Sequence, residues 1–462
     1  MSALPLAIPR ALDFQKFTAD PLAFLGQARS ALGDLFVLRE EGAIFSRASG
    51  CPGVVAVFGA VGQSVVLSDI ETFGMPVSAA LHLKLPPAIV NLNLGLHSMR
   101  GEQHAAHRRL LTTVLNDAAA PCHDHILVAL ESFTQSWRAG AELRMLEAMR
   151  GLALEIAKCV LFDDGLAHHS ELASLLDTYF HLRREVSSPF GSAHPGGREA
   201  LVALGTSLDD ALRRYIRHCR GPGRDSTKGL IARLAQAGAE TGTSLDENTV
   251  VGHANVVFVS STEPIAVALT WVLLLLSQLP DLRDQIRKDL ARSEPSSVGV
   301  LLDRILDECL RLLPPNAIMV RATTRSTRLL NVSLPPGCEI ILSPFLSHRD
   351  PERFPHPTHF VPARWATAKP SPFEYFPFGA GGHACAGRGL AYHLLKTAMV
   401  FLLQRYDLVL SSDQEVDWRI HIQFMPRIDP RIWVQAAGTP SARQAGRLRG
   451  PVARLVCLPG QR

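Results

Sequence analysis

The sequence lacks both a paired-cysteine pattern and a strong net charge. Its eight cysteines are scattered through 462 residues without a CxxC pair, so neither a disulfide framework nor a cysteine-based zinc site is indicated. A net charge of +4 is too small for this length to indicate nucleic-acid binding. There is also no repeat of fixed period and no evident internal linker. We therefore expect one large unit in a reducing compartment.

Long apolar segments of the membrane type are also absent. The N-terminal segment already carries Arg10, Asp13 and Lys16 and contains no extended hydrophobic stretch, so it predicts neither a secretory signal nor a membrane anchor. The most apolar run, Ile265–Leu276, is well short of the length that a helix needs to span a bilayer. These absences predict a cytoplasmic protein.

Hydrophobic residues nevertheless make up 47% of the chain, enough for a large core or a large apolar pocket. The N-terminal part, 1–75, mixes short helical and strand-like segments, with strands expected at 54–59 and 64–67. The pattern is mainly helical from Gly101 to about residue 313, and strand character returns over 327–345. The expected fold class is mainly α with small β-sheets (α+β).

The C-terminal end of the chain has a different composition. Residues 438–462 carry five arginines and no acidic residue. Such a basic, polar end is typical of disordered tails. We therefore predict a single domain over residues 1–437, followed by a disordered basic tail over 438–462.

A glycine-rich segment contains the one cysteine whose surroundings indicate chemistry. It reads Phe-Gly-Ala-Gly-Gly-His-Ala-Cys-Ala-Gly over residues 378–387, directly before a predicted helix. A cysteine at this position is favoured as a thiolate, because the first helical turn presents unpaired N–H groups and a partial positive charge. The glycines let the backbone approach a flat ligand and direct amides toward the sulfur. Cys385 is therefore the candidate metal ligand.

This segment resembles the signature F-x-x-G-x-x-x-C-x-G of the cytochrome P450 family. The four fixed positions are matched by Phe378, Gly381, Cys385 and Gly387. The resemblance implies a triangular helical prism that holds heme b between a long distal helix and the cysteine loop. It makes Cys385 the axial ligand of the heme iron, places Phe378 near the sulfur, and directs His383 toward a heme propionate.

Further motifs of the family occur in the expected order. Glu308 and Arg311 lie three residues apart on a predicted helix, and Arg364 follows in a Pro-rich segment; the family joins these residues in a buried structural triad. His104, Arg108 and Arg321 resemble the family's propionate-binding positions. The resemblance extends over about residues 20–436.

The predicted distal helix departs from the family pattern. Glu263 keeps the usual acidic residue, but Pro264 replaces the threonine that usually helps to protonate bound dioxygen. Proline removes an N–H and clashes with the carbonyl of Ser260, which predicts a kink. Because residues 260 and 261 lie one turn earlier on the same face as Pro264, we hypothesise that Ser261, ordered water or a substrate hydroxyl replaces the threonine. Glu263, Ser261 and Pro264 are thus the candidate catalytic residues.

The resemblance implies a monomeric monooxygenase that inserts one oxygen atom into a hydrophobic small molecule. No flavin or iron–sulfur segment is fused to the chain, so electrons from NAD(P)H are expected through a separate ferredoxin and its reductase, with Arg109 and Arg388 near the docking surface. The alternatives are a peroxide-driven oxygenase, a heme-thiolate isomerase or dehydratase, and a heme protein without oxygen activation. Pocket-lining positions are expected at 79–96, Ile265, Ala317-Ile318 and Phe424-Met425.

Overall fold

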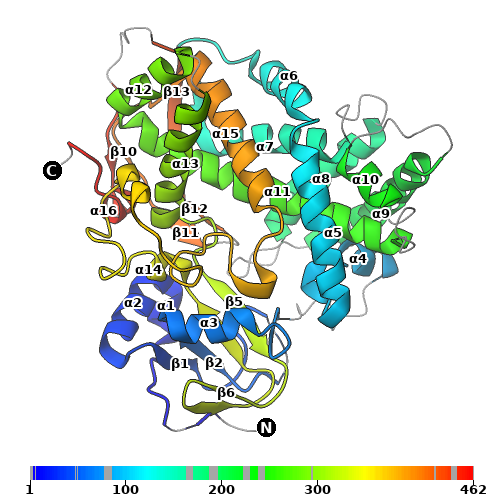
Figure 1. Ribbon diagram of the computed structural model, residues 1–462, viewed down its shortest axis with the longest axis vertical. Helices are drawn as coiled ribbons and strands as arrows, with labels where there is room; N and C mark the ends of the chain where they lie inside the picture. The colour runs from blue at the N-terminus through cyan, green and yellow to red at the C-terminus, as the bar shows by residue number, and fades with distance from the viewer. Residues whose placement is uncertain are drawn as a thin grey trace.

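The computed structural model describes residues 4–5, 7–46, 48, 50–76, 86–162, 170–186, 196–221, 229–237, 245–292, 295–420, 423–438 and 445–460. Helices dominate from residue 87 to residue 312, and small sheets lie at both ends of this region (Figure 1). The expected class, mainly α with small β-sheets, is confirmed.

The helices are α1 (Phe14–Ala19), α2 (Pro21–Leu32), α3 (Ala60–Ser68), α4 (Pro87–Leu92), α5 (Gly101–Ala119), α6 (His123–Thr134), α7 (Met145–Phe162), α8 (Ser170–Val186), α9 (Gly197–Cys219), α10 (Leu230–Gln236), α11 (Glu247–Ser277), α12 (Pro280–Ala291), α13 (Pro295–Leu312), α14 (Pro344–Ser347), α15 (Arg388–Arg405) and α16 (Pro451–Leu455). Short 3-10 turns occur at η2 (Leu96–Ser98), η3 (Pro362–Ala366) and η4 (Gly381–His383).

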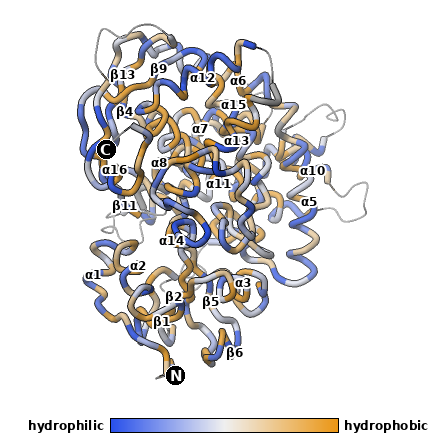
Figure 2. Tube along the Cα trace, turned by 60° about the vertical axis from the view of Figure 1, so that its left-hand side comes forward, coloured by the Kyte–Doolittle hydropathy of each residue, from blue (hydrophilic) through white to orange (hydrophobic). Residues whose placement is uncertain are grey.

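Helix α11 is the centre of the helical region. It packs most extensively on α7 and also touches α4, α9, α10, α13 and α15. A helix that is apolar all round must be buried on all sides, and the α11 tube is orange along much of its length inside the molecule (Figure 2). Among the described residues, α11 is the one helix long and apolar enough to span a membrane, but 78% of its apolar window is buried within the protein.

Local sequence explains how α11 begins and continues. The Asp246 side chain accepts a hydrogen bond from the Thr249 amide at 2.8 Å, which satisfies one of the free N–H groups of the first turn. The helix runs without interruption through Pro264 to Ser277. The kink expected at Pro264 stays a prediction.

The main sheet lies beside α1–α3, at the lower end of Figure 1. Its strand order is β1 (Leu35–Arg39), β2 (Val54–Val57), β8 (Glu339–Leu342), β5 (Met319–Thr323) and β3 (Phe73–Gly74). The β2–β8 pair is parallel and the other pairs are antiparallel. The strand expected at 54–59 is confirmed over Val54–Val57, and Gly59 instead caps α3. The strand character of 327–345 appears as β6, β7 and β8.

The strand expected at residues 64–67 is wrong, because these residues belong to helix α3. The β-branched run favours a strand locally. As a helix, the segment buries Val66 and Leu67 in the core of the sheet region while Val65 stays exposed. Tertiary packing therefore overrides local propensity here.

The remaining strands form small sheets. Their orders are β4 (Glu142–Arg144), β13 (Arg431–Ala436) and β9 (Tyr406–Leu410) in one sheet; β11 (Trp418–Ile420) with β12 (Phe424–Pro426); β6 (Thr327–Leu329) with β7 (Val332–Leu334); and β10 (Gln414–Glu415) with β14 (Leu448–Arg449).

The disorder expected for the C-terminal tail is wrong for residues 445–460. Strand β14 pairs in parallel with β10, and α16 follows it. The Cys457 N–H donates to the Thr358 carbonyl at 2.8 Å, and the Cys457 carbonyl accepts from the Phe360 N–H at 2.9 Å. The prediction of disorder rested on the net charge of the tail and did not consider the apolar residues between the arginines. Two of them, Val452 and Val456, are buried. Residues 439–444 and 461–462 of the predicted tail lie outside the described residues.

If the tail is part of the fold, a charge buried in it must be costly. We expect Val452→Asp to lower the free energy of unfolding by several kcal/mol, because Val452 is fully buried and the new carboxylate has no partner. Arg454→Asp, at an exposed position of the same helix, is the matched control and should have little effect. Urea unfolding followed by circular dichroism measures both. Equal stability of the two variants would mean that the tail is dispensable.

Candidate functional site

The Cys385 loop crosses the junction between the sheet region and the helices, and α15 rises directly from it (Figure 1). Its turns are closed by backbone hydrogen bonds: the Cys385 N–H donates to the Phe378 carbonyl at 2.8 Å, and the Ala384 N–H donates to the Gly381 carbonyl at 3.1 Å. Helix α15 begins at Arg388, three residues after the cysteine. The loop therefore presents Cys385 at a helix N-terminus, as the sequence predicted.

Surroundings of the Cys385 sulfur suit a metal-bound thiolate. The residue retains accessible surface, yet protein atoms crowd it closely enough that burial raises the pKa of its thiol. The Gly387 N–H and the positive charge of Arg108 act in the opposite direction and lower the pKa. Both favour the anionic sulfur that an iron ion would bind.

Gly381 has a structural reason to be glycine. Its φ is +66°, and a Cβ at this position would lie 1.9 Å from the Leu67 carbonyl oxygen at the end of α3. No side chain fits there, so the glycine allows the loop to pack on α3. The close approach that the structure shows at Gly381 is thus one of backbone to backbone. The approach of the loop glycines to a flat ligand stays a prediction.

The four predicted propionate-binding residues come together from separate elements. His104 of α5 lies edge-on to His383 of the loop, with ring centroids 5.0 Å apart. Arg108 of α5 donates from Nη1 to the Ala384 carbonyl at 2.6 Å, which joins α5 to the loop. Arg321 of β5 is 3% exposed, and its charge is close enough to lower the pKa of His383.

This cluster holds uncompensated positive charge. Burial lowers the pKa of Arg321 to about 10. Burial, followed by the charges of Arg321 and His104, lowers the pKa of His383 to about 3. The Nε2 atom of His104 is buried without a hydrogen-bond partner. Two carboxylates here would pair with the buried positive charge and accept a hydrogen bond from His104. The residues therefore fit the propionates of a heme whose iron is bound by Cys385.

His97 is a further member that the sequence reasoning missed. It lies in η2, and burial, Arg321 and His104 lower its pKa. The stretch 79–96 was interpreted as an apolar cover of a pocket, and a single histidine at its end carries no motif. Its position shortly before the helix that holds His104 is the only signal that the sequence offered.

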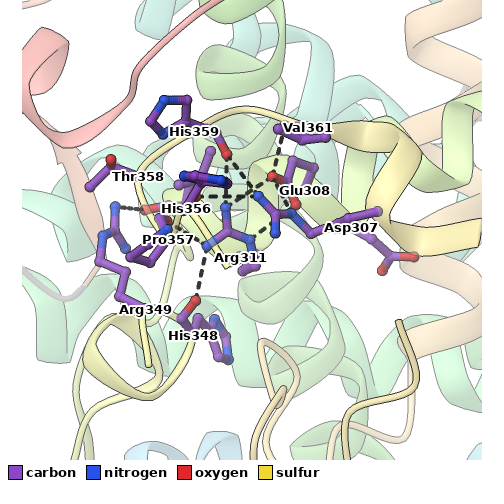
Figure 3. Close-up of polar contacts among 12 residues, drawn as sticks. Asp307, Glu308, Arg311, His348, Arg349, His356, Pro357, Thr358, His359 and Val361 are labelled. Atoms are coloured by element: carbon purple, nitrogen blue, oxygen red, sulfur yellow. Dashed lines mark hydrogen bonds and ion pairs between the residues drawn. The ribbon is translucent and has the colours of Figure 1, made fainter. Parts of the chain in front are cut away.

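The predicted structural triad is present and fully bonded (Figure 3). Glu308 and Arg311 have no exposed surface, and Arg311 makes a bidentate pair with the carboxylate at 2.9 and 3.0 Å. Arg364 donates to the same carboxylate at 3.0 Å, and Trp365 donates from Nε1 at 2.9 Å. The remaining N–H groups of Arg311 reach backbone carbonyls, so the buried charges are satisfied.

Glu263 on α11 is held by an arginine that the sequence analysis did not identify. Arg150 of α7 is 6% exposed and donates to both carboxylate oxygens of Glu263, with Nε 3.0 Å from Oε2. Arg150 also bonds Glu147 at 3.0 Å and contacts the Met425 sulfur at 3.7 Å. Burial lowers the pKa of Arg150, but the two carboxylates outweigh it and raise the pKa overall. A lone arginine on a helix gave no motif from which to predict this pair.

The hydroxyl predicted to replace the threonine points elsewhere. Ser261 is 9% exposed, and its Oγ donates to the Val257 carbonyl at 2.7 Å. Ser260, in contrast, is exposed in the middle of this mostly buried helix. Val256 and Pro264, four residues on either side, are partly exposed and lie on the same row. The structure therefore places Ser260, rather than Ser261, on the accessible row with Pro264.

Several predicted lining positions belong to the core instead. Ile265 and Ala317 are 4% and 2% exposed, and Phe424 is fully buried against Trp271. Only Ile318 in this set is partly exposed. Of the predicted cover (79–96), residues 79–85 lie outside the described residues.

Comparisons with known proteins agree with this geometry. A family model described as cytochrome P450 matches residues 88–427, so the chain belongs to the cytochrome P450 family. It is an oxidoreductase of the monooxygenase type. Cyclooctatin synthase of Streptomyces melanosporofaciens is 26% identical, over 71% of this chain and 74% of that protein. Taxane 10-beta-hydroxylase of Taxus cuspidata is 23% identical, over 72% of this chain and 70% of that protein.

Solved structures confirm the predicted P450 fold. Retinoic acid bound cyanobacterial CYP120A1 superposes with a TM-score of 0.75 and 20% identity, covering 94% of this chain and 100% of that one. The heme domain of cytochrome P450DA superposes with a TM-score of 0.77 and 21% identity, covering 93% and 97%.

The Arg150–Glu263 pair gives a stability prediction. Arg150→Met leaves the Glu263 carboxylate buried without its partner and should cost about 3–5 kcal/mol of unfolding free energy. Adding Glu263→Gln removes the unpaired charge and should recover much of the loss. The control is Arg214→Met, whose side chain is 54% exposed beside Glu171, itself 71% exposed; an exposed pair contributes at most about 1 kcal/mol. A large loss that the second substitution fails to reduce would show that Arg150 acts through packing alone.

Proposed function

We propose that this chain binds heme b through Cys385 and inserts one atom of dioxygen into a hydrophobic small molecule. The observation that carries the proposal is the accessible Cys385 sulfur next to a cluster around the buried Arg321, which has no carboxylate partner in the described part of the chain. In this arrangement His97, His104, Arg108, Arg321 and His383 hold the two propionates. When bound, a thiolate-ligated heme supplies one-electron and oxygen-activating chemistry.

The distal residues deliver protons. Pro264 has no N–H, so the Ser260 carbonyl lacks its usual helical donor and is free to hold an ordered water. The Ser260 hydroxyl on the accessible row is a second group that can bond this water. Arg150 holds the Glu263 carboxylate in one orientation next to Pro264. The negative charge of Glu263 therefore stays at a fixed place beside Ser260 and Pro264. The Ser261 hydroxyl donates to a carbonyl within the helix. Ser261 therefore helps to set the backbone conformation of this turn and does not donate a proton itself.

We propose a cyclic hydrocarbon skeleton as the substrate class. The partly exposed residues of α11 near Ser260 are Val256, Val257, Val259, Glu263 and Pro264. All but Glu263, whose carboxylate is bonded to Arg150, are apolar and favour an apolar ligand. Two relatives act, by their names, on cyclooctat-9-en-7-ol and on taxanes. Both names describe ring systems of this kind.

Electrons come from NAD(P)H through a separate ferredoxin and its reductase in a cytoplasmic, monomeric enzyme. Arg109 on α5 and Arg388 on α15 are both exposed. Their charges suit an acidic electron donor.

A peroxide-driven oxygenase is the second candidate, since Pro264 removes the usual proton-delivering hydroxyl. A fatty-acid carboxylate would need a free cation at this point of the pocket. Arg150 is the nearby cation, and it is already bonded to Glu263 and Glu147. The geometry therefore favours the reductase-dependent route and disfavours a fatty-acid substrate.

A reconstitution experiment separates the two routes. With NADH, a ferredoxin and its reductase, we expect oxygen from isotopically labelled dioxygen to appear in the product of a cyclic terpene substrate. A panel of cyclic terpenes should also shift the heme spin state, and linear fatty acids of equal carbon number should not. Turnover with hydrogen peroxide alone, without any reductase-dependent product, would overturn the proposal.

The two serines give a matched pair of variants. Ser260→Ala should increase the release of hydrogen peroxide per NADH consumed several-fold, because the hydroxyl that holds the water is lost. Ser261→Ala removes only a hydrogen bond within the helix and should leave this ratio nearly unchanged. The opposite order would restore Ser261 as the replacement for the threonine.

A further inference from the structure

Two tyrosines share one carboxylate next to the Cys385 loop. Tyr392 of α15 and Tyr375 both donate their phenol hydrogens to Oδ1 of Asp307 on α13, Tyr375 at 3.0 Å. The side chain of Asp307 points away from the Glu308 triad (Figure 3), and in the described part of the chain it forms no ion pair. Its principal polar partners are therefore the two phenols.

This cluster reaches the sulfur loop on one side. The ring of Tyr392 lies 5.5 Å, centroid to centroid, from the ring of Phe378. The Phe378 carbonyl in turn accepts the Cys385 N–H at 2.8 Å. One aromatic contact and one hydrogen bond therefore separate the phenol from the proposed iron ligand.

On the side away from the Cys385 loop, Tyr375 connects Asp307 to a partly exposed tryptophan. The ring of Tyr375 lies 4.5 Å from that of Trp365, which is partly exposed and donates to Glu308. Tyrosine and tryptophan are the side chains that most readily lose one electron, and the chain has only five of each. Two tyrosines and one tryptophan thus form a continuous row from the loop toward the surface.

We propose that Tyr392, Asp307 and Tyr375 form a proton-coupled radical-transfer unit that carries an oxidising equivalent from the Cys385 site to Trp365. The proposal rests on the proposed heme at Cys385. A plain structural role, in which the tyrosines only satisfy a buried carboxylate, predicts no redox behaviour.

The transfer balances in electrons and protons. The oxidant is hydrogen peroxide, which takes up two electrons and two protons at the Cys385 site and becomes two molecules of water. The unit supplies the electrons one at a time, and over two rounds two thiols become one disulfide and release the two protons. Tyr392 gives one electron to that site, its O–H bond breaks, and the proton passes to Asp307, which leaves a neutral tyrosyl radical and a carboxylic acid. Trp365 then supplies an electron through Tyr375, Asp307 returns the proton, and a thiol or another one-electron reductant restores the tryptophan. The unit would remove oxidising equivalents when substrate is absent.

The buried carboxylate suits this role. Burial raises the pKa of Asp307, although the two phenols oppose the shift. Burial also raises the pKa of both phenols, so neither tyrosine loses its proton to water in the resting protein. A proton that leaves with an electron then has Asp307 as its nearest acceptor.

Radical detection tests the proposal on the heme-loaded full chain. Mixing with hydrogen peroxide without substrate, followed by freezing and electron paramagnetic resonance, should show a tyrosyl radical. Tyr392→Phe keeps the ring contact with Phe378 but should lose this signal and bleach its heme several-fold faster. The control is Tyr406→Phe, because Tyr406 bonds the Thr134 carbonyl elsewhere in the fold; it should retain the signal.

Asp307→Asn tests the proton acceptor separately and should reduce the radical yield while both tyrosines remain. A wild-type protein without a tyrosyl radical, or an unchanged radical in Tyr392→Phe, would overturn the proposal. The reduced carbon monoxide complex of the same samples keeps the two questions apart: thiolate-type absorption without a radical rejects the radical unit alone, whereas loss of that absorption in the wild type rejects the proposed function.

Discussion

The close contact of the Cys385 loop with α3 and α5 is the constraint on which the site depends. Gly381 leaves no room for a side chain against Leu67, and Arg108 bonds the carbonyl next to the cysteine. These contacts fix the sulfur at the junction of the sheet region and the helices. A loop with one more atom at Gly381 would have to move away from α3, and the sulfur would move with it.

Charge around this loop explains why the fold and the cofactor belong together. Arg321 is buried and His383 is partly buried, and no carboxylate of the described residues pairs with them. A ligand that binds only the folded chain stabilises it by mass action, and two propionates would do so at this cluster. The Glu308 triad is different, because its charges are satisfied within the protein. The cluster around Arg321 and His383 therefore implies a bound ligand, whereas the Glu308 triad stabilises the fold.

Sequence reasoning reached the groups whose roles follow from spacing. Cys385 lies in a motif that also has a physical reading, whereas the Glu308 triad and the cluster around His104 and Arg321 were predicted from the resemblance to the cytochrome P450 family. Arg150 and His97 were missed, since each meets its partners only across elements that the fold brings together. Ser261 was preferred over Ser260 because helix periodicity fixes a face only to within about one residue. The packed tail was missed because counting arginines hid the apolar residues between them.

The central claim is that the Cys385 sulfur binds a heme iron, and the absorption of the reduced carbon monoxide complex tests it most directly. The account predicts the long-wavelength band characteristic of thiolate ligation for the wild-type protein, and its loss in Cys385→His. A wild-type band at the shorter wavelength typical of histidine ligation, in protein that retains its fold, would contradict the account.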